Sequence, residues 1–440
     1  MSKAAVAIVS GSERLRSALS ALRHRNYRLY WFGQLSSVLA QNMEGVAQSW
    51  LVLELTDSPL LLGLTGLSFA APTIALTLLG GVIADRTDRR RIMILSQSIS
   101  ASTFFLLATL IVLERVALWH VMSLAFLSGC VRAFDRPSRM ALLPQMVPKD
   151  DIPNAVAVGG TIWQVNRLVG PAVAGLLIYS LGVGATYFFC FCASLSAVCL
   201  WLGIRLQPLP HRASTGGVLQ HMTEGLNFIR QNQIYYTFIG MIFFNSVFGM
   251  SYLILMPVFA RNVLHVGSQG FGFLQSVGGA GALVGVLAVA WFSHSRKKGL
   301  LAIFGAAVFG FLLIAFALSS SYPFSLTLAL VLGIAGQFYM TTISTILQVN
   351  LPNQLRGRVM SIYGLAWELM PVGGMIAGAI AEFAGAQFAV AFGGAMVAGM
   401  DRTSGTFERH QYDPASPAKL SRPPLSKEVP CCSAIRKNRI

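Results

Sequence analysis

Two long apolar runs, 60–84 and 92–113, flank a short turn that holds four arginines and two aspartates. Each run is near the roughly 20 residues that a helix needs to cross the hydrocarbon core of a bilayer. Because so many charged side chains cannot lie together in hydrocarbon, the turn lies in water and the runs on either side of it are membrane spans. Basic loops stay on the cytoplasmic side of a membrane, so we expect this turn in the cytoplasm.

The composition indicates a protein that crosses the membrane many times. Of its 440 residues, 54% are hydrophobic and only 11% are charged, whereas soluble proteins carry about 25% charged residues. The net charge of +16 comes from basic residues before Tyr30, in alternate loops and in the tail, while the other loops hold only Arg115 and Arg261. This alternation indicates a cytoplasmic N-terminus and argues against a nucleic-acid partner.

The succession of apolar runs and turns predicts an all-α membrane protein with twelve spans. A shift of 204 residues places Gly129 on Gly333 and Pro148 on Pro352, so the two halves repeat. The last apolar run, 386–400, would form about 22 Å of helix, which is shorter than the roughly 30 Å core, so the last helix is short or incomplete. We expect five parts: a cytoplasmic segment 1–28, a six-helix bundle 29–204, a cytoplasmic linker with an amphipathic helix 205–233, a C-terminal helix bundle 234–400, and a polar, disordered cytoplasmic tail 401–440.

No pattern of residues suggests catalysis or a bound cofactor. No span offers a nucleophile with a base and an orienting group, and no loop has the form of a phosphate-binding loop. The six cysteines follow neither a metal-site spacing nor a disulfide framework. We therefore expect a protein that is not an enzyme and that holds no cofactor or metal.

The turn after the second span carries a motif. From Gly81 to Arg90 it reads Gly-x-x-x-Asp-Arg-x-x-Arg-Arg, and it resembles the signature loop between helices two and three of the major facilitator superfamily. The resemblance implies two six-helix bundles in a pseudo-two-fold repeat, with this loop fastening the halves on the cytoplasmic side. In that reading Asp85 meets the start of span eleven near Arg358. The residues implied in gating are Gly81, Asp85, Arg86, Arg89 and Arg90.

Three further stretches narrow the resemblance. Residues 42–53, 132–137 and 355–359 are similar to the exporter branch that includes the enterobactin exporter and related drug efflux proteins. This resemblance implies a monomer in the inner or plasma membrane that exports a small amphipathic organic molecule, a siderophore or a drug, in exchange for protons by alternating access. A nutrient importer with the same fold and a non-transporting membrane sensor or assembly partner are the alternatives.

Charges at membrane depth carry the most functional information in the spans. Each costs about 2.5–3.5 kcal/mol at a helix centre, so each needs a partner or a wet cavity. Arg132 and Asp135 lie one turn apart in span four, and Arg167 lies near mid-depth in span five. We expect Asp135 to pair with Arg132 or Arg167, either as a structural lock or as a gating pair in the translocation path.

Two carboxyl groups, Glu44 in span one and Glu368 in span eleven, are expected near the middle of the membrane. Removal from water disfavours the charged form of a carboxyl, so such a group is suited to take up and release a proton. The alternative is a neutral carboxyl that is hydrogen-bonded to a neighbouring helix. Glu44 is the favoured proton carrier, because spans one and four line the cavity in the family that the chain resembles.

Two prolines occupy similar places in the two halves. Pro171 follows Gly170 in span five, and Pro371 lies in span eleven. Proline removes a helix hydrogen bond and kinks the span. Bending at these hinges during alternating access and static packing are both compatible with the sequence.

Overall fold

The computed structural model describes residues 20–206, 218–291 and 298–411, and these ranges contain helices but no strand. In a bilayer a spanning segment must satisfy its backbone groups internally, which long apolar helices do. A side-chain cap marks the start of α3. Ser58 Oγ accepts a hydrogen bond from Leu61 N (3.3 Å) where α3 begins, and the preceding turn is followed by Pro59 at the first helical position.

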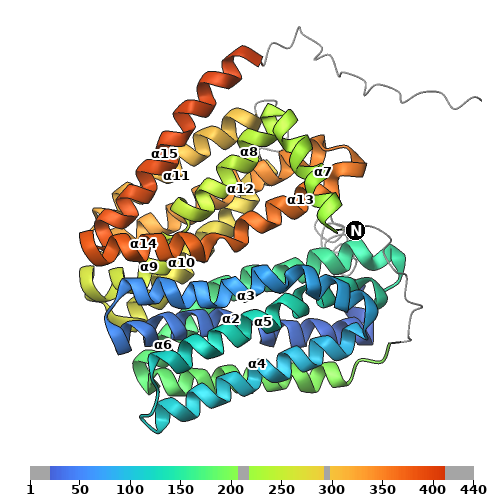
Figure 1. Cartoon of the computed structure of the whole chain (residues 1–440). Helices are drawn as coiled ribbons and strands as arrows, with labels where there is room; N and C mark the ends of the chain where they lie inside the picture. Colours follow the sequence, from blue (N-terminus) through green and yellow to red (C-terminus); the bar gives the residue numbers. More distant parts are fainter. Residues whose placement is uncertain (1–19, 207–217, 292–297, 412–440) are drawn as a thin grey trace, which may run out of the picture.

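The N-terminal half consists of six helical passes, α2 to α5 and the two parts of α6, and they lie side by side (Figure 1). One long element, α6, makes two of them because the chain bends at Gly182, where φ is 83° and ψ is 171°. Glycine adopts this backbone conformation without the steric cost that a side chain brings. The elements of this half are η1 (Ser20–Arg23), α2 (Arg25–Thr56), α3 (Pro59–Arg86), α4 (Arg89–Val112), α5 (Leu118–Leu142), η2 (Leu143–Gln145), η3 (Lys149–Asp151) and α6 (Ile152–Leu202).

The C-terminal half follows the helix α7 (Val218–Gln231), which lies within the predicted linker. Its first pass is interrupted by two π-helical turns, η4 and η5, and its fifth pass is broken between α13 and α14. The elements are α8 (Gln233–Phe244), η4 (Asn245–Gly249), α9 (Tyr252–Val258), η5 (Phe259–Val263), α10 (Gly267–Trp291), α11 (Lys298–Ala317), α12 (Tyr322–Asn350), α13 (Asn353–Glu368), α14 (Met370–Ala384) and α15 (Ala386–Gln411).

Twelve passes can be traced in the described chain. Eight helical stretches are long and apolar enough to cross a bilayer, judged by length and composition, and one of them, Lys149–Leu202, makes two passes. The helices α2 and α5 and the shorter apolar helix Ala386–Gly399 supply the other three. The predicted all-α membrane fold with two six-helix bundles and a short last span is therefore confirmed.

The predicted boundary at residue 400 differs from the structure. The helix α15 continues to Gln411, past the end of the apolar run. A helix satisfies its own backbone hydrogen bonds, so it continues into polar sequence once it leaves hydrocarbon. The rest of the predicted tail, 412–440, lies outside the described residues, as does the segment 1–19.

The start of the first pass is fastened to the start of α6. His24 Nε2 lies 2.7 Å from Asp151 Oδ2, and Ser20 Oγ donates a hydrogen bond to Asp151 Oδ1 (2.7 Å). These hydrogen bonds, from His24 and then from Ser20, hold the pKa of the Asp151 carboxyl below its ordinary value. Tyr27 Oη also donates to the carbonyl of Ala155 (2.6 Å), so the first turns of α2 and α6 are held together.

The end of the bundle with turns at Asp57, Glu114 and Gly182 is here called the outer end, following the predicted orientation, and the opposite end is the inner end. The two halves meet along two seams, α3 against α14 and α6 against α10. In Figure 1 the helices α14 and α3 lie close together at the left, and α11, α12 and α15 rise away from the N-terminal half toward the right.

Glycines make the close approach at both seams possible. A Cβ built on Gly175 of α6 would lie 2.9 Å from Gly272 Cα and 2.7 Å from the Ser268 carbonyl oxygen of α10. A Cβ built on Gly63 of α3 would lie 2.7 Å from the carbonyl oxygen of Gly374 in α14. Small residues of this kind let helix backbones touch in a membrane, where packing replaces the hydrophobic effect as the source of association.

Charged side chains also join the halves at the outer end. Glu382 Oε2 of α14 accepts hydrogen bonds from Ser58 Oγ (2.8 Å) and from Leu60 N (3.2 Å) at the start of α3. Arg261 Nη1 of η5 donates to the Leu53 carbonyl (2.7 Å) near the end of α2. The anion meets a helix N-terminus and the cation a helix C-terminus, so both contacts are favoured by the helix dipoles.

We expect Gly175→Ala to destabilise the contact between α6 and α10 by about 1–3 kcal/mol, because forcing an extra methyl into a filled contact strains the neighbouring backbone. Thermal melting of the purified protein measures the effect. The matched control is Gly160→Ala in the same helix, where an added Cβ meets nothing within 4 Å. Equal melting temperatures for the two variants would show that the seam tolerates a wider separation.

Candidate functional site

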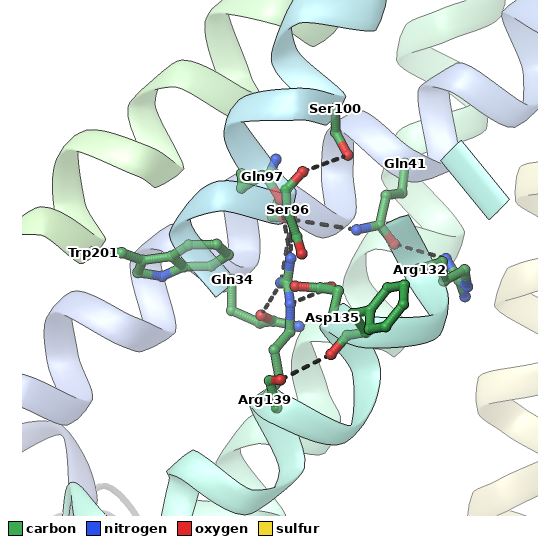
Figure 2. Close-up of polar contacts among 12 residues, drawn as sticks. Gln34, Gln41, Ser96, Gln97, Ser100, Arg132, Asp135, Arg139 and Trp201 are labelled. Atoms are coloured by element: carbon green, nitrogen blue, oxygen red, sulfur yellow. Dashed lines mark hydrogen bonds and ion pairs between the residues drawn. The ribbon is translucent and has the colours of Figure 1, made fainter. Parts of the chain in front are cut away.

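A cluster of polar side chains occupies the interior of the N-terminal half, between α2, α4 and α5 (Figure 2). It encloses a cavity of about 40 Å³, which exceeds the 10–15 Å³ or so that one water molecule needs. The cavity is therefore large enough and polar enough to hold water inside the bundle. Its polar lining consists of Gln41, Glu44, Ser96, Gln97, Ser100, Ser128, Arg132, Asp135 and Arg139.

The Arg139 guanidinium lies at the centre of this cluster (Figure 2). Its Nη1 donates to Gln34 Oε1 (2.5 Å) and its Nη2 to Gln97 Oε1 (3.0 Å). Both Nη atoms also donate to Ser37 Oγ, each at 3.3 Å. The guanidinium carbon lies 4.5 Å from the centre of the Trp201 ring, a cation–π contact with α6. Arg139 is only 7% exposed, so these partners replace the water that a buried cation would otherwise lose.

Asp135 supplies the counter-charge one turn before Arg139. Its Oδ2 lies 2.6 Å from Arg139 Nε, but the Nε hydrogen does not point at that oxygen, so the contact is an ion pair without a hydrogen bond. The other oxygen, Oδ1, is buried and has no hydrogen-bond partner within the described residues. Asp135 also lines the cavity, and a buried acceptor without a protein partner is a group that a bound water molecule would satisfy.

Hydrogen bonds connect this centre to a second arginine. Gln41 Nε2 donates to Ser37 Oγ (3.3 Å), and Arg132 Nη1 donates to Gln41 Oε1 (3.2 Å). Glu44, one turn beyond Gln41 on α2, lines the same cavity as Arg132. The cluster thus brings three of the predicted membrane charges, Glu44, Arg132 and Asp135, to one small polar space.

The predicted partners of Asp135 were wrong. Asp135 pairs with Arg139, four residues further along α5 and therefore on the same helix face. Arg132 is turned toward Gln41, and Arg167 lies apart from the cluster, where its Nη1 donates to Gln337 Oε1 of α12 (3.1 Å). The i to i+4 spacing within one helix brings the two groups together without any requirement on how spans four and five pack.

Glu368 contacts a neighbouring helix, as one of its two expected roles required, but its partner there is an arginine. Glu368 Oε1, at the end of α13, lies 2.5 Å from Arg136 Nη1 of α5. This ion pair joins the two halves, as does the hydrogen bond from Arg167 to Gln337. Polar contacts across the boundary between halves depend on how the bundles are docked, and one sequence carries no direct signal of that docking.

Part of the gating motif lies where the structure describes only the backbone. Gly81, Asp85 and Arg86 belong to the last turns of α3, and the placement of their side chains lies outside the described part. The contact expected between Asp85 and Arg358 therefore stays a prediction. Arg358 itself forms an ion pair with Glu224 of α7, which attaches this helix to α13.

The other end of the motif begins α4. Asp88 Oδ1 accepts a hydrogen bond from Arg90 N (2.9 Å) and so caps the helix that Arg89 opens. The Arg90 side chain extends away from α4, and its Nη2 donates to the Leu202 carbonyl (2.7 Å) at the end of α6. A cation at a helix C-terminus is favoured by the helix dipole, so Arg90 ties the inner ends of two passes together.

The two predicted hinges differ in their surroundings. Gly170 and Pro171 lie within the continuous helix α6, and a Cβ on Gly170 would lie 2.7 Å from Asn42 Cβ of α2. Pro371 follows a break in the helix at Leu369, where α13 ends and α14 begins. Bending at either place remains a prediction, but the chain is already interrupted beside Pro371 and closely packed beside Gly170.

Sequence reasoning missed Arg139 and its amide partners Gln34 and Gln97. A signal was available, since Arg139 continues the face that carries Arg132 and Asp135. Its position near the inner end of span four made it resemble an ordinary basic residue at the membrane surface. Within the described ranges, no group of three or more His, Cys, Asp or Glu side chains is placed to hold a metal ion.

Comparison with known proteins supplies the context for this site. A family model described as "transmembrane secretion effector" matches residues 16–429. The macrolide efflux protein A of Streptococcus pyogenes is 23% identical over 374 residues, which cover 82% of this chain and 91% of that protein. The enterobactin exporter EntS of Shigella boydii is 22% identical over 353 residues, covering 78% of this chain and 82% of that protein.

The fold has counterparts among solved structures. A bacterial homologue of the human lysosomal transporter Spinster, in an inward-facing and occupied conformation, superposes with a TM-score of 0.71. The match covers 88% of this chain and 97% of that chain at 14% sequence identity. At this identity the likeness shows the arrangement of the helices alone.

Proposed function

Because the chain belongs to the transmembrane secretion effectors of the major facilitator superfamily, we propose that it exports a small amphipathic organic molecule, a drug or a siderophore, across the plasma membrane. The similar proteins named above are a macrolide efflux protein and an enterobactin exporter, so the proposal covers both a drug and a siderophore. Like its relatives, the chain is a multi-pass membrane transporter and not an enzyme.

Alternating access is the proposed mode of movement. The two halves are joined at the outer end by glycine seams and by Glu382 and Arg261. These are non-covalent packing contacts and hydrogen bonds. Breaking them would let the outer ends separate while the inner ends close. In that cycle the motif from Gly81 to Arg90 fastens the inner ends, and the chain beside Pro371 supplies the bend.

Proton entry is the proposed driving force. The observation that carries this proposal is the cavity inside the N-terminal bundle that is lined by three charged side chains, Glu44, Arg132 and Asp135. Charged groups at this depth are costly and are retained where they move ions or substrate. We propose that Glu44 exchanges the proton and that the arginines respond to its change of charge, with Asp135 and its free oxygen as the route to water.

The same proposal covers the orientation of the chain in the membrane and the roles of its bundles, linker and tail. The N-terminus lies in the cytoplasm, the bundles 29–204 and 234–400 form the two moving halves, and the linker 205–233 with α7 joins them along the inner surface. We propose that the transporter works as a monomer, since one chain supplies both bundles. The tail from 401 onward takes no part in transport beyond the helical turns that extend α15.

Reconstitution into liposomes tests the proposal. A macrolide and enterobactin are offered to proteoliposomes with an imposed pH gradient, and a trapped pH dye reports proton movement. We expect substrate and protons to move in opposite directions, and both movements to stop when an ionophore collapses the gradient. Movement of both in the same direction would indicate an importer. If no substrate in a broad panel of drugs and siderophores moves, the result favours the non-transporting alternative.

A further inference from the structure

A second cavity, distinct from the polar one, opens at the outer end of the molecule. Its volume is about 610 Å³, and it lies where α2 ends, where α4 turns into α5, where α6 bends and where α10 begins. Ligand pockets for small organic molecules have volumes of about 300–1,000 Å³. None of the residues that line this outer pocket lines the polar cavity, so the two are separate sites.

The lining of the outer pocket has the chemistry of a site for an organic cation. Two carboxylates, Glu54 and Glu114, lie on it, and both residues are exposed. Neither makes an ion pair within the described residues, and the described lining includes no Lys or Arg. Trp50 and Tyr179 supply aromatic rings, and most of the remaining lining is apolar. Negative charge, aromatic faces and apolar walls together favour a cation with an apolar body.

The outer pocket also spans the boundary between the halves. Most of its lining comes from the N-terminal half, but Gly267 and Ser268 belong to α10 of the C-terminal half. Beside it, the ring of Trp50 stacks on Phe271 of α10, with ring centres 6.3 Å apart. A ligand that touches both halves binds best to the conformation in which these elements meet, and it therefore shifts the population toward that conformation.

We propose that the outer pocket binds a monovalent organic cation, an ammonium group attached to an apolar or aromatic body, and that the bound cation holds the outer ends of the two halves together. The ammonium lies between Glu54 and Glu114, and the apolar body lies against Trp50. This site is independent of the transported molecule, since binding to it requires neither a substrate nor a proton gradient.

A lipid with an amine head group offers the same ammonium chemistry. Such a lipid also brings a phosphate next to its amine. The described lining gives that phosphate two carboxylates and no cationic side chain, so repulsion disfavours it. A free cation without phosphate is therefore the favoured occupant, and the experiment compares the two directly.

Isothermal titration calorimetry on the purified full-length protein, in a neutral maltoside detergent, measures ligand affinity at this site. The probe is benzyltrimethylammonium, and dihexanoyl phosphatidylethanolamine below its micelle concentration is the lipid comparison. We expect the double variant Glu54→Gln/Glu114→Gln to bind the probe about tenfold more weakly than the parent. The matched control, Asp57→Asn, removes an outer carboxylate that lies 3.6 Å from Arg261 and outside the pocket, and it should leave the affinity within about twofold.

A second arm tests the coupling to the halves. The probe should raise the melting temperature of the parent, because a ligand that binds the folded state stabilises it. In Gly175→Ala, which moves α6 from α10, the probe should bind several-fold more weakly although both carboxylates remain. Equal affinity of the parent and the double variant would overturn the cation site. Tighter binding of the lipid than of the probe would overturn its assignment to a free cation, and unchanged affinity in Gly175→Ala would overturn the coupling.

Discussion

Arg139→Met should destabilise the N-terminal half by about 3–5 kcal/mol, because it leaves the buried Asp135 carboxylate without its cation. The side chains of Arg139 and Asp135 are 8% and 13% exposed, so solvent replaces little of what is lost. The change also leaves the carbonyl oxygens of Gln34 and Gln97 without their donor. The expected result is an apparent melting temperature about 10 °C lower for the purified protein.

Two matched variants distinguish the loss of a buried charge from the loss of an arginine in general. Arg136→Met changes the same residue type three positions earlier on α5, at a side chain that is 59% exposed, and should cost less than about 1 kcal/mol. The double variant Asp135→Asn/Arg139→Met removes both charges and should recover part of the loss, because no uncompensated charge remains. If Arg139→Met and Arg136→Met melt alike, the cluster around Arg139 is not what stabilises this bundle.

The spans were predictable from sequence because the bilayer imposes a length on every apolar run. The turns at Asp57, Asp88 and Glu114 could also be predicted from the sequence, because charged residues and proline interrupt the apolar runs there. The end of α15 was missed, because a helix that leaves the membrane needs no apolar residues to continue. Apolar length predicts where a span can start and stop, and it says little about how far the helix projects beyond the membrane.

The candidate site was only partly predictable. The sequence identified Glu44, Arg132 and Asp135 as charges that need a partner, and the structure places all three around one cavity. It did not identify the partners. Gln34 and Gln97 are uncharged, so their residue type alone did not identify them as partners of a buried arginine. Their role depends on which faces of α2 and α4 are turned toward α5. Contacts between halves, such as Arg136 with Glu368, depend further on docking of two separate bundles.

Glu44→Gln should reduce proton-driven export to the background of protein-free liposomes. Glutamine keeps the size of the side chain and its place beside the cavity, but it cannot take up or release a proton. Substrate exchange across the membrane without a gradient should continue, because exchange requires only that the loaded halves move. Two assays on the same preparation check this. One measures export driven by an imposed pH gradient, and the other measures exchange of labelled for unlabelled substrate at equal pH.

Two controls make this result specific to the polar cavity. Glu54→Gln removes a carboxylate from the same helix at the outer pocket, and it should leave proton-driven export near the parent level. Glu368→Gln removes the carboxylate that pairs with Arg136, and it should alter the rate of both export and exchange, because it weakens a contact between the halves. If Glu44→Gln still exports in proportion to the pH gradient, the proton moves through another group, and Asp135, with its free buried oxygen on the same cavity, is the next residue to replace.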